Sequence, residues 1–219
     1  MTVKVNLTDR RAAEGLHPHG HSGWWRRVCT GAGLVSALAG LGTLAAAPTN
    51  ATTGLSNGSF ETPVLTPNTI QRLFTGQSIG AWKVTKGDVD LIGAGFWQAA
   101  DGVQSLDLDG ANNGTISQTF DTLPLVKYEV SYALAGNIAN GPVVKTGQVL
   151  VNGRVVQNFS FDITGKSRTD MGYVTKEVTF LATGTSTTLQ FSSTTSPSGW
   201  GPVIDKVDVE SCLVIVCLH

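Results

Sequence analysis

The sequence predicts an all-β domain, and three observations lead to this fold class. Gly is abundant, with 26 among 219 residues, and Thr, Ser, Asn and Val are also common, whereas only 14% of the residues are charged. After about residue 50 no segment shows the apolar period of a helix, and short alternating segments recur between turn residues. Short strands at this spacing are typical of β-sandwiches and barrels.

The first 47 residues have the features of a secretory signal peptide with cleavage after Ala47. Arg26 and Arg27 precede residues 28–46, an apolar segment rich in Ala, Gly and Leu that ends in small residues. Two alternatives stay open: twin-arginine export, although Val28 and Cys29 match that motif poorly, and an uncleaved segment just long enough to span a bilayer. We expect a cleaved leader, and hence a secreted, extracellular protein.

Residues 48–55 are expected to form a linker, residues 56–210 the domain and residues 211–219 a tail. A length of this order allows one domain. Each expected strand is an alternating or apolar run bounded by turn residues. The expected strands span residues 81–85, 88–92, 104–108, 115–120, 127–134, 145–151, 155–161, 173–180, 187–191 and 203–209.

The alternation of side chains predicts which strand faces are buried. In residues 127–134 one face carries Tyr128, Val130, Tyr132 and Leu134, and the other carries Lys127, Glu129 and Ser131. Packing on one face and water on the other explains this pattern. The same logic places Leu106 and Leu108 inside, with Asp107 and Asp109 outside. Asn152-Gly153 predicts a two-residue hairpin turn, because both residues adopt positive φ readily.

The last expected strand carries an acid within an apolar row. Val203, Asp205, Val207 and Val209 share one face. A buried, unpaired carboxylate must find a cation, backbone N–H groups, a metal ion or a proton. We expect residues 57–61, which open the domain, to bring that partner. The alternative is that Asp205 lies at a sheet edge and is solvated.

Charge and histidine content narrow the functions. The net charge of −1 without a basic cluster argues against a nucleic-acid partner. After leader removal His219 is the one histidine, so no Ser-His-Asp triad is expected. A two-carboxylate glycosidase stays formally open, but solvation or calcium binding explains the positions of the acids more simply, and no enzyme is expected. The acids concerned are Glu61, Asp88, Asp90, Asp107, Asp109 and Asp205.

The tail contains the two cysteines that remain after leader removal, Cys212 and Cys217. An exported compartment favours a disulfide between them. A loop this short adds at most about 2 kcal/mol of stability, so the bond would clip the terminus rather than hold the fold. The apolar run between the cysteines is too short to cross a membrane, and no membrane span is expected in the mature chain.

An ordered set of motifs resembles the DUF642 family and its bacterial relatives, the choice-of-anchor C domains. The motifs are Asn57-Gly58-Ser59-Phe60-Glu61-Thr62-Pro63, Ile79-Gly80-Ala81-Trp82, Gly87-Asp88-Val89-Asp90-Leu91-Ile92, Ala100-Asp101-Gly102 running into residues 104–110, Ile116-Ser117-Gln118-Thr119-Phe120 and Gly201-Pro202-Val203-Ile204-Asp205-Lys206-Val207. The resemblance covers about residues 56–210. It implies a galactose-binding-like jelly-roll β-sandwich, similar to carbohydrate-binding modules. Plant members are cell-wall proteins associated with polysaccharide and pectin methylesterase.

The resemblance also implies a metal site. In related sugar-binding modules the Asn-Gly-Ser-Phe-Glu opening and the Asp of the last strand contribute to a structural calcium site. Glu61 and Asp205 are therefore the expected ligands, with a carbonyl from Ser59. The chain departs from plant members in having one domain instead of two in tandem, and in having Trp200 where those relatives tend to have Cys.

Sugar binding requires a flat aromatic face with polar groups beside it. Trp97 and Trp200 lie in Gly-rich loops, where a large apolar side chain is hardest to bury; the alternative is that each packs under its own loop. Asn137 and Asp90 are expected to supply polar contacts. The sequence thus predicts a secreted, non-catalytic polysaccharide-binding domain. The rival interpretation is an extracellular adhesion module that docks a wall-modifying enzyme.

Overall fold

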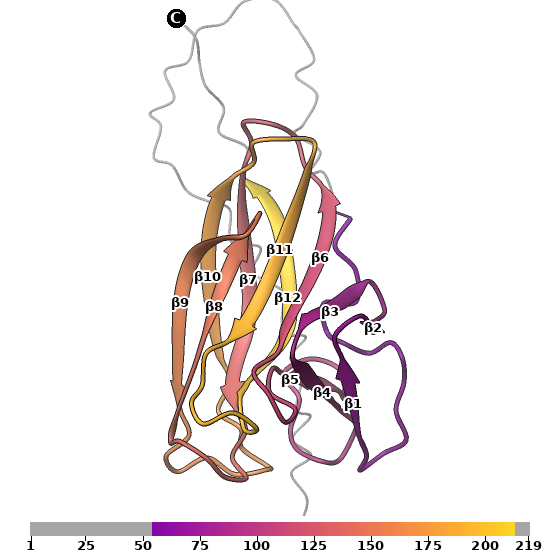
Figure 1. Cartoon of the computed structure of the whole chain (residues 1–219), viewed down its shortest axis with the longest axis vertical. Helices are drawn as coiled ribbons and strands as arrows, with labels where there is room; N and C mark the ends of the chain where they lie inside the picture. The colour runs from indigo at the N-terminus through magenta and orange to yellow at the C-terminus, as the bar shows by residue number, and fades with distance from the viewer. Residues whose placement is uncertain (1–53, 213–219) are drawn as a thin grey trace, which may run out of the picture. The chain divides into compact units, whose positions relative to one another are not determined.

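The computed structural model describes residues 54–212, which form two antiparallel β-sheets packed face to face (Figure 1). The predicted all-β sandwich is therefore confirmed. The predicted leader, nearly all of the linker and Cys217 lie outside the described residues. Within them, no helix has the length and apolar character that a membrane crossing requires.

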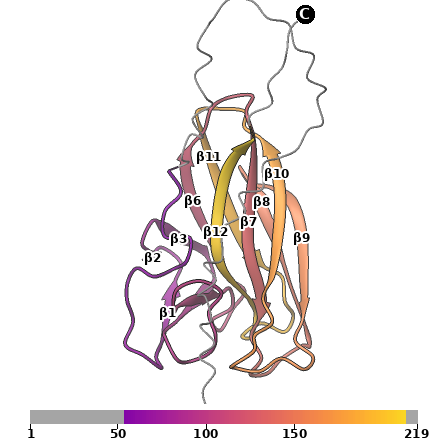
Figure 2. The same cartoon turned by 180° about the vertical axis from the view of Figure 1, so that it is seen from behind.

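Each sheet has six strands. In spatial order, sheet A contains β1 (Ile70–Phe74), β4 (Asp88–Ile92), β5 (Ser105–Asp107), β12 (Pro202–Cys212), β7 (Lys127–Gly136) and β10 (Val174–Leu181). Sheet B contains β2 (Ser78–Ile79), β3 (Trp82–Lys86), β6 (Thr115–Asp121), β11 (Ser186–Ser193), β8 (Val144–Val151) and β9 (Arg154–Asp162). The last strand, β12, thus lies in the middle of sheet A, beside β7 (Figure 2).

Every strand expected from the sequence is present, with small shifts at its ends. The turn between β8 and β9 has φ of 50° at Asn152 and 77° at Gly153, which confirms the hairpin. Strands β1 and β2 were not expected. In β1 only Leu73 is buried, while Ile70 and Phe74 are largely exposed, so this edge strand shows no alternation that a sequence pattern could reveal.

Aromatic side chains fill the space between the sheets. The ring of Tyr132 from sheet A lies 5.8 Å from that of Phe159 and 5.0 Å from that of Phe191, both from sheet B. Trp82 lies 6.1 Å from Phe191 and 5.9 Å from Phe60. These tilted and edge-on pairs are a favourable geometry for aromatic rings. The inward face predicted for β7 is confirmed, because Tyr132 and its same-face neighbours are fully buried.

A bulge in β12 corrects the predicted row of Val203, Asp205, Val207 and Val209. Asp205 pairs with Ala133 of β7, but Asp208 pairs with Ser131, so β12 has one extra residue between them. Lys206, within the bulge, has φ of 49°. Since cross-strand partners share a face, Asp205 lies with Ala133 on the outer face of sheet A, whereas Val209 lies with Val130 between the sheets.

The outer face of sheet A is covered, which corrects a second prediction. Asp107 and Asp109 were expected in solvent, yet both are buried. Loops cover these two acids, because Asn137 Nδ2 donates to Asp107 and Asn113 Nδ2 donates to Asp109. Residues 93–104 cover the neighbouring part of the face, where Trp97 Nε1 donates to Ser105 Oγ at 2.8 Å on the outer side of β5. Gln98 N in turn donates to the Arg168 carbonyl at 2.8 Å, so residues 163–173 hold the segment from the side.

The beginning of the domain meets its last strand, as the sequence predicted. Val207 N of β12 donates to the Gly58 carbonyl at 2.9 Å, and Trp82 Nε1 donates to the Asn57 carbonyl at 3.1 Å. A Cβ atom on Gly58 would lie 1.9 Å from the Val207 carbonyl oxygen, so only glycine fits this approach. The segment that opens the domain therefore packs against β12 and Trp82.

Candidate functional site

Three loops meet at one end of the sandwich, which is the lower end in Figure 1. They are residues 108–114 after β5, 137–143 after β7 and 194–201 after β11. We call this region the loop end. Asn113 Nδ2 donates to the Thr195 carbonyl at 2.8 Å, and Asn137 N donates to the Gly201 carbonyl at 2.9 Å. Hydrogen bonds between the loops thus hold them in one arrangement.

Trp200 is the partly exposed aromatic side chain of the loop end. It packs against Gly141, where a Cβ atom would lie 3.1 Å from Trp200 Cε3. The next residue is anchored below, because Gly201 N donates to Asp107 Oδ1 at 3.1 Å. The position of Trp200 is therefore fixed by its backbone and by the neighbouring loop.

A buried polar network lies beneath Trp200. Asp107 is 1% exposed and accepts hydrogen bonds from Asn137 Nδ2 at 2.7 Å and Asp109 N at 2.9 Å. Burial raises the pKa of Asp107 to about 8, although these donors oppose the shift, and burial raises that of Asp109 to about 6 against hydrogen bonds from Ser193 and Asn113. Burial also lowers the pKa of Lys145, which donates to the Asn140 carbonyl at 2.8 Å.

The remaining acids of this region are bound by specific donors. Arg72 donates to both oxygens of Asp90, at 2.8 and 2.9 Å, and Asp90 pairs across the strands with Asp107. Asp88 accepts hydrogen bonds from Ala111 N and from the backbone and side chain of Asn112. Asp90 is 8% exposed, so the structure places this predicted ligand residue beneath the surface, as a partner of Arg72.

Trp97 differs from the prediction as well. Its side chain is 6% exposed and its indole N–H is bonded to Ser105, so it packs under its own loop. Asn137 reaches the loop end, but its Nδ2 binds Asp107 and its Oδ1 accepts from Ala139 N at 2.9 Å. Of the two predicted tryptophans, Trp200 is therefore the one that stays partly exposed at the loop end.

The predicted metal ligands hold the segment that covers sheet A. Asp205 Oδ2 accepts hydrogen bonds from Ala100 N and Asp101 N at 2.7 and 2.9 Å. Glu61 Oε1 accepts from the backbone N–H groups of residues 103 and 104, both at 2.8 Å. Ser59 Oγ donates to Asp101 Oδ2 at 2.6 Å. The partner of Asp205 thus comes from residues 100–101 and not, as expected, from residues 57–61.

These contacts bear on the calcium prediction. Calcium requires six to eight oxygens directed at the ion, whereas both oxygens of Asp205 and one of Glu61 already accept N–H groups. Among residues 54–212 no group of three or more His, Cys, Asp or Glu is arranged to hold a metal ion. Asp205 and Glu61 thus serve to hold residues 100–104 in place. Calcium binding stays a prediction from the resemblance.

Lys145 is a functional side chain that the sequence prediction missed. It is fully buried, and it faces the same way along β8 as Val149 and Val151. Strict alternation in residues 145–151 places a lysine on the core face, and that signal could have revealed it. Arg72 gave no comparable signal, because it belongs to β1, which the sequence did not reveal.

A family model described as "Protein of unknown function (DUF642)" matches residues 53–210. Among curated proteins, Halomucin of Haloquadratum walsbyi is 30% identical over 182 residues, which cover 80% of this chain and 2% of Halomucin. The chain thus spans about 2% of the length of that relative.

Among solved structures, the fold is similar to a family 35 carbohydrate binding module from Clostridium thermocellum. That similarity has a TM-score of 0.42 and 14% identity, and it covers 64% of this chain and 97% of the module. The fold is also similar to TmCBM61 in complex with β-1,4-galactotriose, with a TM-score of 0.44 and 17% identity over 73% of this chain and 98% of that one.

The buried acids predict how stability depends on pH. Burial raises the folded-state pKa of Asp109, Asp205 and Asp107 to about 6, about 7 and about 8. A carboxyl group with a raised pKa contributes its full stability at low pH and loses it as the pH rises through the folded value. Between about pH 5 and about pH 9 we expect the melting temperature to fall by on the order of 5 °C.

Thermal unfolding followed by circular dichroism measures this profile. Asp107→Asn removes the group with the highest of these pKa values, so its profile should be flatter above about pH 7. A melting temperature that rises across the same range in the unmodified protein would contradict the proposed burial of neutral acids.

A chelator separates a loop anchor from a calcium site. Asp205→Ala removes the acceptor for Ala100 N and Asp101 N, so we expect its melting temperature to fall by on the order of 5 °C. If Asp205 is a loop anchor alone, backbone donors fill its oxygens, and EDTA should change the melting temperature of neither the unmodified protein nor the variant. If EDTA lowers the melting temperature of the unmodified protein and leaves that of Asp205→Ala unchanged, calcium binds here, as the resemblance implies.

Proposed function

The chain belongs to the DUF642 family, and from this premise and the geometry of the loop end we propose that it binds polysaccharide outside the cell without catalysing a reaction. Trp200 carries the proposal. An indole held in one position offers its apolar face to the C–H groups of a sugar ring. Because Gly201 and Gly141 already fix Trp200, little conformational freedom is lost on binding.

Polar groups for sugar hydroxyls lie beside Trp200. Asn140 is exposed, and its Oδ1 accepts from Gly141 N at 2.9 Å, which leaves the amide nitrogen to donate to a ligand. Asn137 lies beneath this surface, where its side chain binds Asp107 and so holds the loop of residues 137–143 in place. In this proposal Asn140 contacts the ligand, while Asn137 and the buried acids keep the loops in place.

The surroundings of the acids favour binding over hydrolysis. A glycosidase needs one carboxyl group as acid and a second as nucleophile or base, both open to the sugar. Asp107 and Asp109 have raised pKa values, but both are buried under the loops. Asp88, Asp90 and Asp205 bind structural donors. Asp88, Asp90, Asp107 and Asp109 thus support the loop end, and Asp205 holds residues 100–101 over sheet A.

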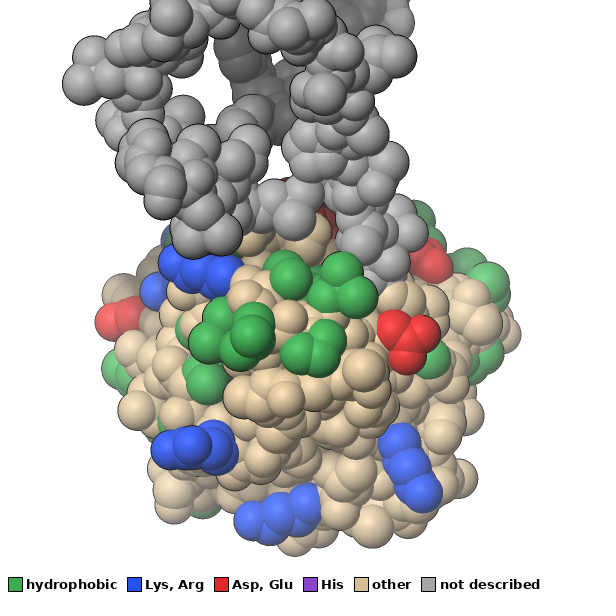
Figure 3. Space-filling view, turned by 90° about the horizontal axis from the view of Figure 1, so that it is seen from above, with side chains coloured by type: hydrophobic (Ala, Val, Ile, Leu, Met, Phe, Trp, Pro, Cys, Tyr) green, Lys and Arg blue, Asp and Glu red, His purple; other side chains and the backbone are tan. Residues whose placement is uncertain are grey.

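A different surface favours the rival function, an adhesion module that docks an extracellular enzyme. Leu123, Leu125 and Leu181 are 55%, 81% and 56% exposed. Leu123 and Leu125 lie in the loop between β6 and β7, Leu181 ends β10, and the two segments are neighbours, since Leu125 N donates to the Ala182 carbonyl at 2.8 Å. Figure 3, which views this end of the sandwich, shows hydrophobic side chains gathered on it. A grouped apolar surface is typical of a protein contact.

Removal of the tryptophan tests polysaccharide binding. Trp200→Ala should weaken retention by a soluble polysaccharide in affinity electrophoresis about tenfold or more, because it deletes the apolar face. Phe74→Ala is the matched control: it removes an exposed aromatic ring from β1 and should not change retention. If a panel of neutral and charged polysaccharides retains neither the unmodified protein nor Phe74→Ala, polysaccharide binding is wrong.

Export is tested by the position of cleavage. Protein recovered from the culture medium should begin at Pro48, which intact-mass measurement would show. A mature protein found only inside cells with its first residues intact would contradict the extracellular part of the proposal.

A further inference from the structure

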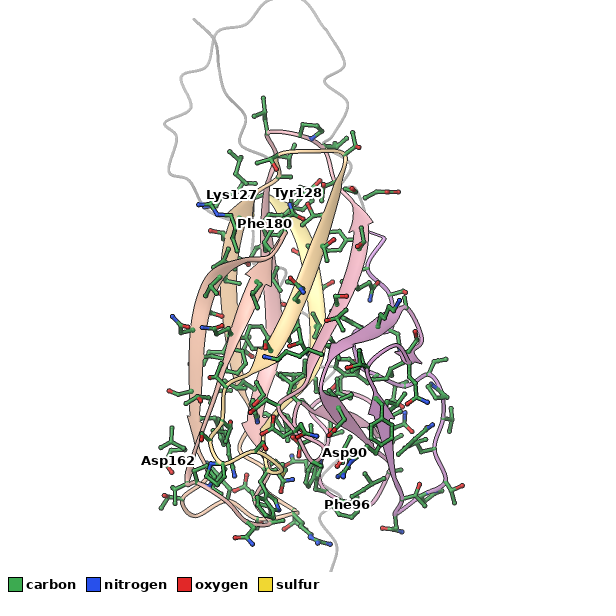
Figure 4. The ribbon with its side chains drawn as sticks, viewed as in Figure 1. Asp90, Phe96, Lys127, Tyr128, Asp162 and Phe180 are labelled. Atoms are coloured by element: carbon green, nitrogen blue, oxygen red, sulfur yellow. The ribbon has the colours of Figure 1, made fainter. Side chains whose placement is uncertain are left out.

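An open pocket of about 520 Å³ lies between residues 95–98 and 168–169. Gly95, Phe96, Trp97, Gln98, Arg168 and Thr169 line it. Gln98 joins both sides, because its N–H donates to the Arg168 carbonyl at 2.8 Å and its Oε1 accepts from Met171 N at 3.0 Å. The pocket is thus built from two segments whose relative position is fixed. Figure 4 shows Phe96 near the lower end of the sandwich.

Arg168 is held over an aromatic ring in this pocket. Its guanidinium carbon lies 4.8 Å from the centre of the Phe96 ring, a favourable cation–π distance. Phe96 in turn packs edge-on against Trp97, with ring centres 5.3 Å apart, and Trp97 is tied to Ser105 by its indole N–H. A chain of contacts from sheet A therefore limits where the guanidinium group can lie.

The charge of Arg168 is not neutralised within the described residues. The ion pair found there joins Arg72 to Asp90. Asp170 is close in sequence to Arg168, but its contacts are with Ser167. Both arginines are thus set beside packed structure, but only Arg72 has an internal carboxylate. A planar guanidinium matches the two oxygens of a carboxylate or a sulfate with parallel N–H bonds.

We propose that this pocket binds the acid group of a charged sugar residue, a carboxylate or a sulfate, through Arg168. The proposal rests on the polysaccharide binding proposed above and adds the chemical class of the ligand. Phe96 keeps the guanidinium in place and leaves its outer edge for the anion. Trp200 contacts an uncharged ring face, so the two sites recognise different features of the glycan.

Affinity electrophoresis of the full chain tests the pocket with three polymers. They are a polyuronate, the same polymer after reduction of its carboxyl groups, and a sulfated polysaccharide. We expect stronger retention by a charged polymer than by the reduced one, and the difference should shrink as salt is added, because a charge–charge contact is screened. Retention by the polyuronate or by the sulfated polymer identifies which acid group is preferred.

Variants of matched charge locate the contact. Arg168→Gln should lose about tenfold of the retention by the preferred charged polymer, and Arg168→Lys should lose part of it, since lysine keeps the charge without the paired donors. Arg154→Gln is the control, because it removes the same charge from the β8–β9 hairpin. Both arginines are exposed, so we expect these variants to fold, and their melting temperatures should equal that of the unmodified protein.

The outcomes separate the two proposals. If the charged and the reduced polymers retain the unmodified protein equally, or if Arg168→Gln behaves like Arg154→Gln, the acid-binding pocket is wrong while binding through Trp200 stands. If no polymer retains the protein, both proposals fail together. If Arg168→Gln loses only the salt-sensitive part of retention and Trp200→Ala loses retention by the reduced polymer, both are supported.

Discussion

The buried carboxylate of Asp205 is the interaction on which the rest of the domain depends. The bulge in β12 turns it to the outer face of sheet A, and there it accepts the N–H groups of residues 100 and 101. Glu61 accepts the N–H groups of residues 103 and 104 in the same segment. Through these bonds an irregular segment becomes a third layer that covers Asp205 and the outer side of β5 at Ser105. This cover buries Asp205 and the loops of the loop end bury Asp107 and Asp109, and burial raises the pKa of all three acids.

The sequence predicted those parts of the fold whose burial follows from the alternation of side chains within one strand. Strand β7 alternates because one of its faces meets the core and the other meets solvent or polar groups, and its inward face was predicted correctly. In β4 and β5 every residue is buried, because Arg72, the loops of the loop end and residues 93–104 together cover the outer face. The sequences of these short strands do not reveal that residues distant in the chain cover them. They also do not reveal the bulge at Lys206.

The same distinction explains the candidate sites. Trp200 was predicted from its loop, and it stays partly exposed because glycines flank it and Gly141 offers no side chain to bury it. Trp97 lies in a similar loop but is covered, because Ser105 bonds its indole. Arg168 was missed: its role comes from Phe96, on a distant loop. Gly-rich composition predicts that a side chain lies in a loop. Whether that side chain is buried, and which residues it contacts, depends on parts of the chain distant in sequence.

Strand β12 has a consequence for how the domain would present a ligand. It starts at Pro202 beside Trp200 and ends at Cys212, and at about 3.3 Å per residue it spans roughly 35 Å. The polypeptide therefore leaves the described region at the pole remote from the loop end. A tether joined after Cys212 would display the proposed binding surface outward, as an oriented layer on a solid support requires.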